Sequence, residues 1–314
     1  MYDFSVVVCT YNSDIKKLFI TLNTIMFQRN CSFEIVIADD GSKMFDEVAI
    51  REYFDRNEFC NYQIVRNLVN NGTVKNCLSG VRLAKGKYIK FISPGDYLYD
   101  ENTLFKFGKF ISNKEYKVVF GRAAYYSVDD KDVTLYQKMN PVDLEPYITT
   151  DKKAIFKNYL YYRDYILGAA FICKKEVLLN YLLKIQEKVK YAEDCSYILM
   201  VADGIEIGLL DDFIIWYEYG TGISTNKSSF WSEMLYKDNL ECFKLVAQGH
   251  PNLKECYDLF IKRKNLRTMC LKWESKLHNK YVKLKKRFCN KKFFKEPDLS
   301  VLKKILFGGN NASN

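Results

Sequence analysis

Three apolar runs in the first third of this chain each end in polar or acidic side chains. The first closes in a Thr-Tyr-Asn sequence, the second in two aspartates and a glycine, and the third in a turn with one aspartate. These endings are Thr10–Asn12, Asp39–Gly41 and Asp96. Because parallel strands present their carboxyl ends at one edge of an α/β sheet, we expect these side chains to share a crevice that binds a metal ion or a phosphate-bearing ligand.

A second pair of carboxylates, Glu193 and Asp194, stands at the start of a helical pattern much later in the chain. A carboxylate can take the proton from an attacking hydroxyl if it lies within hydrogen-bond reach of that hydroxyl. The plainer interpretation is that the pair only complements the positive end of the helix dipole.

The elements that must position these residues alternate between β-rich runs and helical patterns. Strands are predicted at Phe4–Cys9, Phe33–Ala38, Tyr62–Val65, Tyr88–Ile92, Val118–Tyr126, Ile166–Cys173 and Gly204–Ile215, with helices at Ile15–Gln28, Glu47–Asn57, Val74–Ala84 and Glu176–Lys190. This alternation predicts an α/β fold with a mostly parallel central sheet flanked by helices.

In this order, the motifs resemble those of the family 2 glycosyltransferases, which have the Rossmann-like, nucleotide-sugar-binding glycosyltransferase A fold. The family's first two strands typically end Thr-Tyr-Asn and Asp-Asp-Gly-Ser, as Thr10–Asn12 and Asp39–Ser42 do here. Its third signature joins an Asn-x-Gly loop, an Arg-Asn pair and Ala-x-Gly-x-Tyr-Ile, matched by Asn70–Gly72, Lys75-Asn76 and Ala84–Ile89. The resemblance covers about residues 4 to 224 and implies a catalytic domain at residues 1–225.

The resemblance implies a donor nucleotide site at the first two strand ends. One of the two aspartates would accept a hydrogen bond from a uracil ring and help to orient the ribose. A lysine in the family's arginine position could reach the diphosphate as a point charge. The members of this predicted site are Thr10, Tyr11, Asn12, Asp39, Asp40 and Lys75. The alternatives are an ordinary Asx turn at the aspartates and a solvated lysine on a helix face.

The predicted metal site departs from the family pattern. Family members usually carry Asp-x-Asp, which holds Mn²⁺ or Mg²⁺ against the diphosphate, whereas this chain has Ser93-Pro94-Gly95-Asp96. Only Asp96 remains, so a cation there would depend on the diphosphate and on a ligand from later in the chain. The alternative is an aspartate in a Pro-Gly turn that holds no metal.

The resemblance also assigns the later carboxylates. The family's Glu-Asp pair, matched by Glu193 and Asp194, contains the catalytic base of inverting members, which makes Asp194 the predicted base. Beside the base we expect Glu193 and the side-chain-free Gly168, which could let a substrate approach the backbone closely, although small residues there could equally pack under a helix. Ser224 ends a late Gly-x-Ser loop, which in the family folds over the donor. A stacking wall for an acceptor sugar is predicted from Tyr159, Tyr161, Tyr162 and Tyr165.

These expectations describe an inverting glycosyltransferase that moves a sugar from a nucleotide diphosphate, predicted to be a UDP-sugar, to a hydroxyl of a glycan or lipid-linked glycan. Bacterial surface polysaccharide or glycoconjugate synthesis is the expected context. The alternative is a non-catalytic nucleotide-sugar-binding relative with a degenerate metal motif. A nucleotide-sugar pyrophosphorylase is disfavoured because it needs a glycine-rich loop, and Cys9–Asn12 contains no glycine.

Composition favours a cytoplasmic protein. The ten cysteines lie mostly in apolar runs without any Cys-x-x-Cys pair, which predicts reduced core thiols and no zinc site. The chain begins on a strand with no signal peptide ahead of it. No stretch approaches the roughly 20 apolar residues of a membrane-spanning helix.

Residues 226–314 form a basic, mostly helical C-terminal region. From Lys254 to Lys304 there are 17 Lys and Arg against 5 Asp and Glu. Apolar residues recur at helical spacing among the lysines, at Leu266, Trp273, Leu277, Tyr281, Leu284 and Phe288, and Leu299–Phe307 is a second amphipathic piece. Basic amphipathic helices suit an anionic surface such as the inner face of the plasma membrane. Packing on the catalytic domain or in a homodimer is the alternative, and nucleic acid is not an expected partner.

Overall fold

The computed structural model describes residues 2–130, 132–225, 228–268, 288–289 and 292–308. In chain order its main elements are β1 (Phe4–Thr10), α1 (Ile15–Met26), β2 (Phe33–Asp39), α2 (Glu47–Arg56), β3 (Tyr62–Arg66), α3 (Thr73–Leu83), β4 (Tyr88–Ile92), β5 (Tyr97–Leu98), α4 (Thr103–Asn113), β6 (Val118–Asp129), β7 (Asp132–Tyr136), α5 (Glu145–Ile148), α6 (Lys152–Phe156), β8 (Phe171–Lys174), α7 (Lys175–Ile185), α8 (Cys195–Ala202), β9 (Ile207–Glu218), α9 (Ser229–Gly249), α10 (Lys254–Thr268) and α12 (Leu299–Phe307).

One nine-stranded sheet organises these elements, in the order β3-β2-β1-β4-β8-β6-β9-β5, with β7 paired to β6. Strands β1 to β4 are mutually parallel. Strand β8 runs antiparallel to both β4 and β6, and it joins this parallel half to the long parallel pair β6 and β9. The α/β fold with helices around a central sheet is confirmed, parallel in the half that carries the strand-end motifs and mixed beyond β4.

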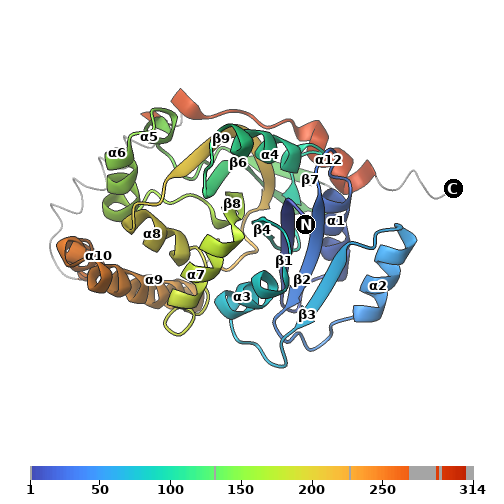
Figure 1. The fold of residues 1–314 in the computed structure, drawn as a ribbon, viewed down its shortest axis with the longest axis horizontal. Helices are drawn as coiled ribbons and strands as arrows, with labels where there is room; N and C mark the ends of the chain where they lie inside the picture. Colours follow the sequence, from blue (N-terminus) through green and yellow to red (C-terminus); the bar gives the residue numbers. More distant parts are fainter. Residues whose placement is uncertain (1, 131, 226–227, 269–287, 290–291, 309–314) are drawn as a thin grey trace.

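Burial on both faces explains the continuous apolar runs of the parallel half. Helices α1 and α2 cover one face of it, and α3 and α7 lie on the other (Figure 1). The three consecutive valines Val6, Val7 and Val8 are 0% exposed, so no alternation of polar and apolar residues is possible there. The register pairs Thr10 with Asp39 and Val8 with Ile92, which brings the three strand endings to the same edge.

The predicted strand Ile166–Cys173 is only partly a strand. Residues Gly168–Ala170 form a single 3₁₀ turn, and β8 begins at Phe171. The carbonyl of Ala169 accepts a hydrogen bond from the buried ammonium of Lys90, so this backbone is held by a side chain of β4 and not by a neighbouring strand.

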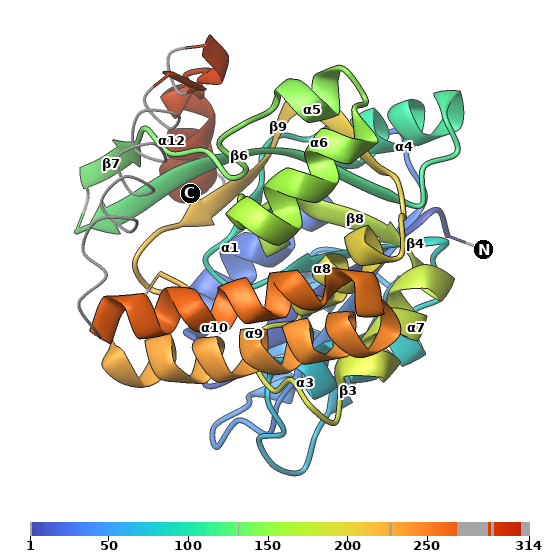
Figure 2. The ribbon, with the colours of Figure 1, turned by 90° about the vertical axis from the view of Figure 1, so that its left-hand side faces the viewer.

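The C-terminal region packs on the catalytic fold at two places. Helices α9 and α10 lie side by side next to α8 (Figure 2). Helix α12 packs against β5, β6 and β9, where Leu302 is fully buried in a cluster with Tyr97, Tyr126 and Trp216. Ile305 and Leu306 pack against the same cluster, so the apolar side of α12 contacts protein.

Most of the predicted basic stripe from Leu266 to Phe288 lies outside the described residues, which resume only at 288. Within the described part of the chain, no helix combines the length and hydropathy needed to cross a membrane. The nine cysteines described there carry free thiols, and most are buried.

Candidate active site

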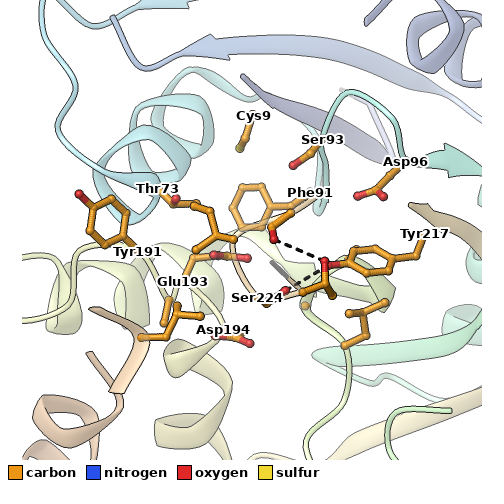
Figure 3. A pocket seen from close by; sticks show the side chains of 18 of the residues that line it. Cys9, Thr73, Phe91, Ser93, Asp96, Tyr191, Glu193, Asp194, Tyr217 and Ser224 are labelled. Atoms are coloured by element: carbon orange, nitrogen blue, oxygen red, sulfur yellow. Dashed lines mark hydrogen bonds between the residues drawn. The ribbon is translucent and has the colours of Figure 1, made fainter. Parts of the chain in front are cut away.

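A cavity of about 810 Å³ lies along the carboxyl edge of β1 and β4 and extends to the start of α8 (Figure 3). Its wall combines segments that are far apart in the sequence. The predicted site residues that line it are Thr10, Tyr11, Asp40, Asp96, Gly168, Glu193, Asp194 and Ser224. Three others, Asn12, Asp39 and Lys75, are not among its lining residues. The structure therefore brings most of the predicted residues to one hollow.

Asp40 shapes the loop that borders the cavity. Its carboxylate is almost completely buried and accepts the backbone N–H groups of Asn71 at 2.9 Å and Gly72 at 2.8 Å. The side-chain amide of Asn67 donates a third hydrogen bond at 3.1 Å. Such a carboxylate fixes the Asn-Asn-Gly loop at the start of α3, which explains why these two sequence motifs occur together.

Asp39 does not line the cavity. It is 0% exposed and accepts the backbone N–H of Ser42 at 2.9 Å, and its Oδ2 lies 3.5 Å from Nε of Arg66. The hydroxyl of Ser42 in turn accepts the backbone N–H of Asn12 at 2.7 Å. Asp39 and Asn12 thus lock the loops after β1 and β2 to each other.

Lys75 lies on the outer side of α3. Its ammonium is 3.5 Å from the carboxylate of Glu187, and both side chains are largely exposed. Lys75 thus pairs with a residue just after α7, and it does not line the cavity.

Asp96 sits at the end of the turn after β4 and is only 6% exposed. Its Oδ1 accepts the backbone N–H of Glu218 at 3.0 Å, and its backbone carbonyl accepts the hydroxyl of Thr21 at 2.9 Å. Gly95 has φ +100°, and a Cβ there would fall 2.4 Å from Oε2 of Glu218. The positive φ strains any other residue at this position, and a side chain would also displace the Glu218 carboxylate.

Burial raises the pKa of Asp96 to about 7, against the hydrogen bond from Glu218 and the charge of Lys90. Lys90 is itself 0% exposed, and its ammonium donates to the carbonyl of Phe91 at 2.8 Å. Burial lowers the pKa of Lys90 to about 7, against the charge of Asp96. Lys90 belongs to none of the family motifs found in the sequence, although a lysine inside an otherwise apolar strand is itself unusual.

Glu193 and Asp194 face the cavity immediately before α8 (Figure 3). Burial raises the pKa of both carboxyls, and the charge of Asp194 raises that of Glu193 further. Gly168 lies directly against the pair, since a Cβ there would be 3.3 Å from Oε1 of Glu193 and 3.5 Å from Cβ of Asp194. A carboxylate with a raised pKa is a stronger base, which suits it to accept a proton from a hydroxyl.

Aromatic side chains complete the wall on this side. Tyr159 and Tyr165 line the cavity with their ring centroids 5.1 Å apart, whereas Tyr161 and Tyr162 are not among the lining residues. In the late loop, the hydroxyl of Ser224 lies 3.1 Å from that of Tyr217. Other residues that line the cavity were not among the site residues predicted from the sequence, namely Tyr125, Lys138, Tyr191, Tyr217, Glu218 and Trp231.

Comparison with known proteins assigns the family. The profile described as Glycosyl transferase family 2 matches residues 5–178, which is more than half of the chain. The chain belongs to glycosyl transferase family 2. It is therefore a glycosyltransferase, and the non-catalytic alternative is not favoured. No curated protein matches the chain.

Solved structures with the same fold include S. aureus TarS 1-349. The form in complex with UDP is 20% identical with a TM-score of 0.55, over 83% of this chain and 71% of that one. A second TarS 1-349 structure is 20% identical with a TM-score of 0.57, over 88% and 77% of the two chains. The complex with UDP-GlcNAc is 20% identical with a TM-score of 0.52, over 78% and 71%. At this identity the likeness shows a common fold.

Family 2 enzymes often use a divalent metal, and Asp96 offers a partial site for one. Among the described residues no three His, Cys, Asp or Glu side chains gather as a metal cluster. Both carboxylate oxygens of Glu218, the nearest acidic neighbour, are hydrogen-bonded to Lys17 at 2.6 and 2.7 Å. Asp96 thus fits a cation that takes one carboxylate and completes its shell with substrate phosphates and water, as Mg²⁺ commonly does.

Proposed function

We propose that this protein is an inverting glycosyltransferase that uses a UDP-sugar donor and a hydroxyl of a glycan or lipid-linked glycan as acceptor. The observation that carries the proposal is the single cavity lined by Asp40, Asp96 and the Glu193–Asp194 pair. The loop after β2, the turn after β4 and the start of α8 all border this cavity although they are far apart in the sequence, which supports a shared site for donor and base. The UDP and UDP-GlcNAc bound by TarS support a uridine donor for a chain of the same fold.

In the proposed reaction, Asp194 accepts the proton of the acceptor hydroxyl. The hydroxyl oxygen bonds to the anomeric carbon while the bond from that carbon to the diphosphate oxygen breaks, and its electrons leave with UDP. Attack from the face opposite the leaving group inverts the anomeric configuration. The buried setting of Asp194 supports the role of a base, because burial raises its pKa.

Donor binding is proposed for the loops held by Asp40 and Asp39, with Thr10, Tyr11 and Asn12 beside the uracil ring. Lys75 would reach the diphosphate only by leaving its pair with Glu187. Mn²⁺ or Mg²⁺ bound at Asp96 would offset the negative charge of the leaving diphosphate. Asp96→Asn should then weaken the gain in UDP affinity that Mn²⁺ gives to the wild type. Equal gains in both proteins, measured by calorimetry, would remove Asp96 from the metal site.

The deciding experiment is a panel of UDP-, GDP- and dTDP-sugars tested for donor hydrolysis and thermal stabilisation of the protein. A uridine donor should stabilise and be hydrolysed, and the others should do neither. Preference for GDP- or dTDP-sugars would overturn the donor assignment while leaving the family membership intact.

For its cellular setting we propose bacterial surface polysaccharide or glycoconjugate synthesis in the cytoplasm, at the inner face of the plasma membrane. The support is the excess of Lys and Arg between Lys254 and Lys304. Binding to vesicles that contain anionic lipid should fall as salt rises, and should be lost on truncation after Asn265. The competing proposal is a homodimer formed through the same basic stripe. It would be favoured if the truncated and full-length proteins bound vesicles equally and the truncation changed the oligomeric state.

A further inference from the structure

Helix α9 buries a carboxylate against the segment that leads into the catalytic pair. Asp238 is 6% exposed, and it accepts three consecutive backbone N–H groups. Its Oδ1 is 3.0 Å from the nitrogen of Lys190, and its Oδ2 is 2.6 Å from that of Tyr191 and 3.0 Å from that of Ala192. The next two residues in the chain are Glu193 and the candidate base Asp194. The hydrogen bonds from Asp238 therefore restrain the backbone two residues before the base.

The three N–H groups need a partner because they precede α8 and have no strand neighbour. A carboxylate that accepts several N–H groups is held firmly, and it holds the backbone in return. Helix α9 follows the residues 5–178 that match the family profile, as do the segment it holds and Asp194 itself.

The same segment is also tied to the nucleotide side of the cavity. The N–H of Val74, in the first turn of α3, donates to the carbonyl of Lys190 at 3.1 Å. Gly72 packs so closely that a Cβ would fall 2.4 Å from Cγ of Lys190. The N–H of Gly72 is bound by Asp40, as described above, so backbone contacts run from Asp40 through Lys190 to Asp238.

We propose that Asp238 is a positioning residue, which holds Lys190–Ala192 so that Asp194 keeps its place relative to both the acceptor and the nucleotide loop. The inference rests on the proposed function of Asp194 as base. Helix α9 is on this view part of the active-site scaffold, and not an appendage to it.

The charge of Asp238 gives the proposal a signature beyond stability. Burial raises the pKa of Asp194 most, and the charge of Asp238 raises it further. The other groups that interact with Asp194 are Glu193, Tyr159, Tyr165, Cys195 and Tyr197. The pKa values of the tyrosines and of Cys195 are raised, so these groups stay neutral in the acid range. Removal of the charge at 238 should therefore move the acid limb of the transfer rate to lower pH.

The test compares Asp238→Asn, Asp238→Glu and the control Glu233→Gln. Glu233 is on the same helix, in an exposed pair with Lys237. We expect Asp238→Asn to lower kcat for transfer about 10–100-fold, because small misplacements of a reacting group are costly. UDP affinity should change less than about 3-fold, since the base does not bind the nucleotide. The acid limb should shift to lower pH, and amide hydrogen exchange at residues 190–194 should speed up.

Asp238→Glu retains the charge, so kcat should fall while the acid limb stays in place. This variant decides the question if Asp238→Asn does not fold. Glu233→Gln should behave as wild type in every measurement. Wild-type kcat, acid limb and exchange in Asp238→Asn, or wild-type kcat in Asp238→Glu, would overturn the proposal. If the wild type transferred no sugar at all, the proposed function would fail separately, and exchange at residues 190–194 would still test the positioning role.

Discussion

The carboxylates on the two sides of the cavity, which we call the nucleotide side and the transfer side after their proposed roles, are held in different ways. On the nucleotide side, Asp40 accepts hydrogen bonds from three groups of a nearby loop. On the transfer side, burial raises the pKa values of Asp96, Glu193 and Asp194. The nucleotide side is thus already satisfied before any ligand binds, whereas the transfer side holds carboxylates whose ionisation is costly. Groups of the second kind are suited to proton transfer and cation binding.

The residues that hold the two sides in place also differ in their separation along the sequence. Asp40 is bound by residues within the same β-α-β unit. Asp96 accepts a hydrogen bond from the backbone N–H of Glu218 on β9. The segment before Glu193 donates its backbone N–H groups to Asp238 on α9. A locally built site can be recognised from a short motif, but a site with remote supports cannot.

The largest expected effect sharpens the contrast at the base. Asp194→Asn keeps the shape of the side chain but removes its basicity, so transfer should fall by about 10²–10⁴-fold. UDP affinity, measured by calorimetry, should stay close to that of wild type. Glu193→Gln is the neighbouring control and should cost less activity. Full transfer by Asp194→Asn, or a product that keeps the donor's anomeric configuration, would refute the assignment.

On the nucleotide side the expected loss is in binding. Asp40→Ala leaves the N–H groups of Asn71 and Gly72 without their acceptor and loosens the loop. UDP affinity should fall by about 1–3 kcal/mol, the cost of unpaired buried polar groups. Lys75→Ala is informative beside it, because Lys75 pairs with Glu187 in the structure. An unchanged affinity in Lys75→Ala would remove that lysine from the donor site, and an unchanged affinity in Asp40→Ala would place the nucleotide elsewhere.

A smaller effect is expected from steric pressure on the carboxyl pair. In Gly168→Ala the new methyl group would stand 3.3 Å from Oε1 of Glu193, so that carboxylate must shift by a few tenths of an ångström. Transfer should fall roughly 3–10-fold, with UDP affinity unchanged, because only the transfer side is disturbed. A matching loss of UDP affinity would mean that the two sides are not independent.

The smallest effect concerns stability and pH. Glu193 ionises near pH 4.3 in an unfolded chain, and burial raises its pKa in the folded protein. Between about pH 4.3 and the folded-state pKa of about 8, the folded state binds more protons than the unfolded state. The free energy of unfolding therefore falls as pH rises through that window. Glu193→Gln should remove this loss and raise Tm by a few degrees at pH 8, with little change at pH 5. An equal Tm shift at both pH values would indicate a packing effect instead.

Helix α12 shows that an amphipathic sequence pattern does not identify the surface against which its apolar side packs. The spacing of Leu302, Ile305 and Leu306 correctly predicts a helix with one apolar side. The sequence favoured a membrane surface for that side, but Leu302 is fully buried against Tyr97 and Trp216. Apolar periodicity identifies a face that must be covered, and it carries no information about what covers it.

The sequence alone predicted the parallel half of the fold and the family, because these depend on short motifs and on strand–helix alternation along consecutive β-α-β units. It also identified Asp96, Gly168, Glu193 and Asp194 as members of one site. Only the tertiary structure decided that Asp39 is fully buried and does not line the cavity, and that Lys75 pairs with Glu187. Likewise, the roles of Lys90, Glu218 and Asp238 depend on contacts between strands and helices that are remote in the chain. Burial and hydrogen bonding at such contacts set the protonation of the transfer side, and no local spacing records them.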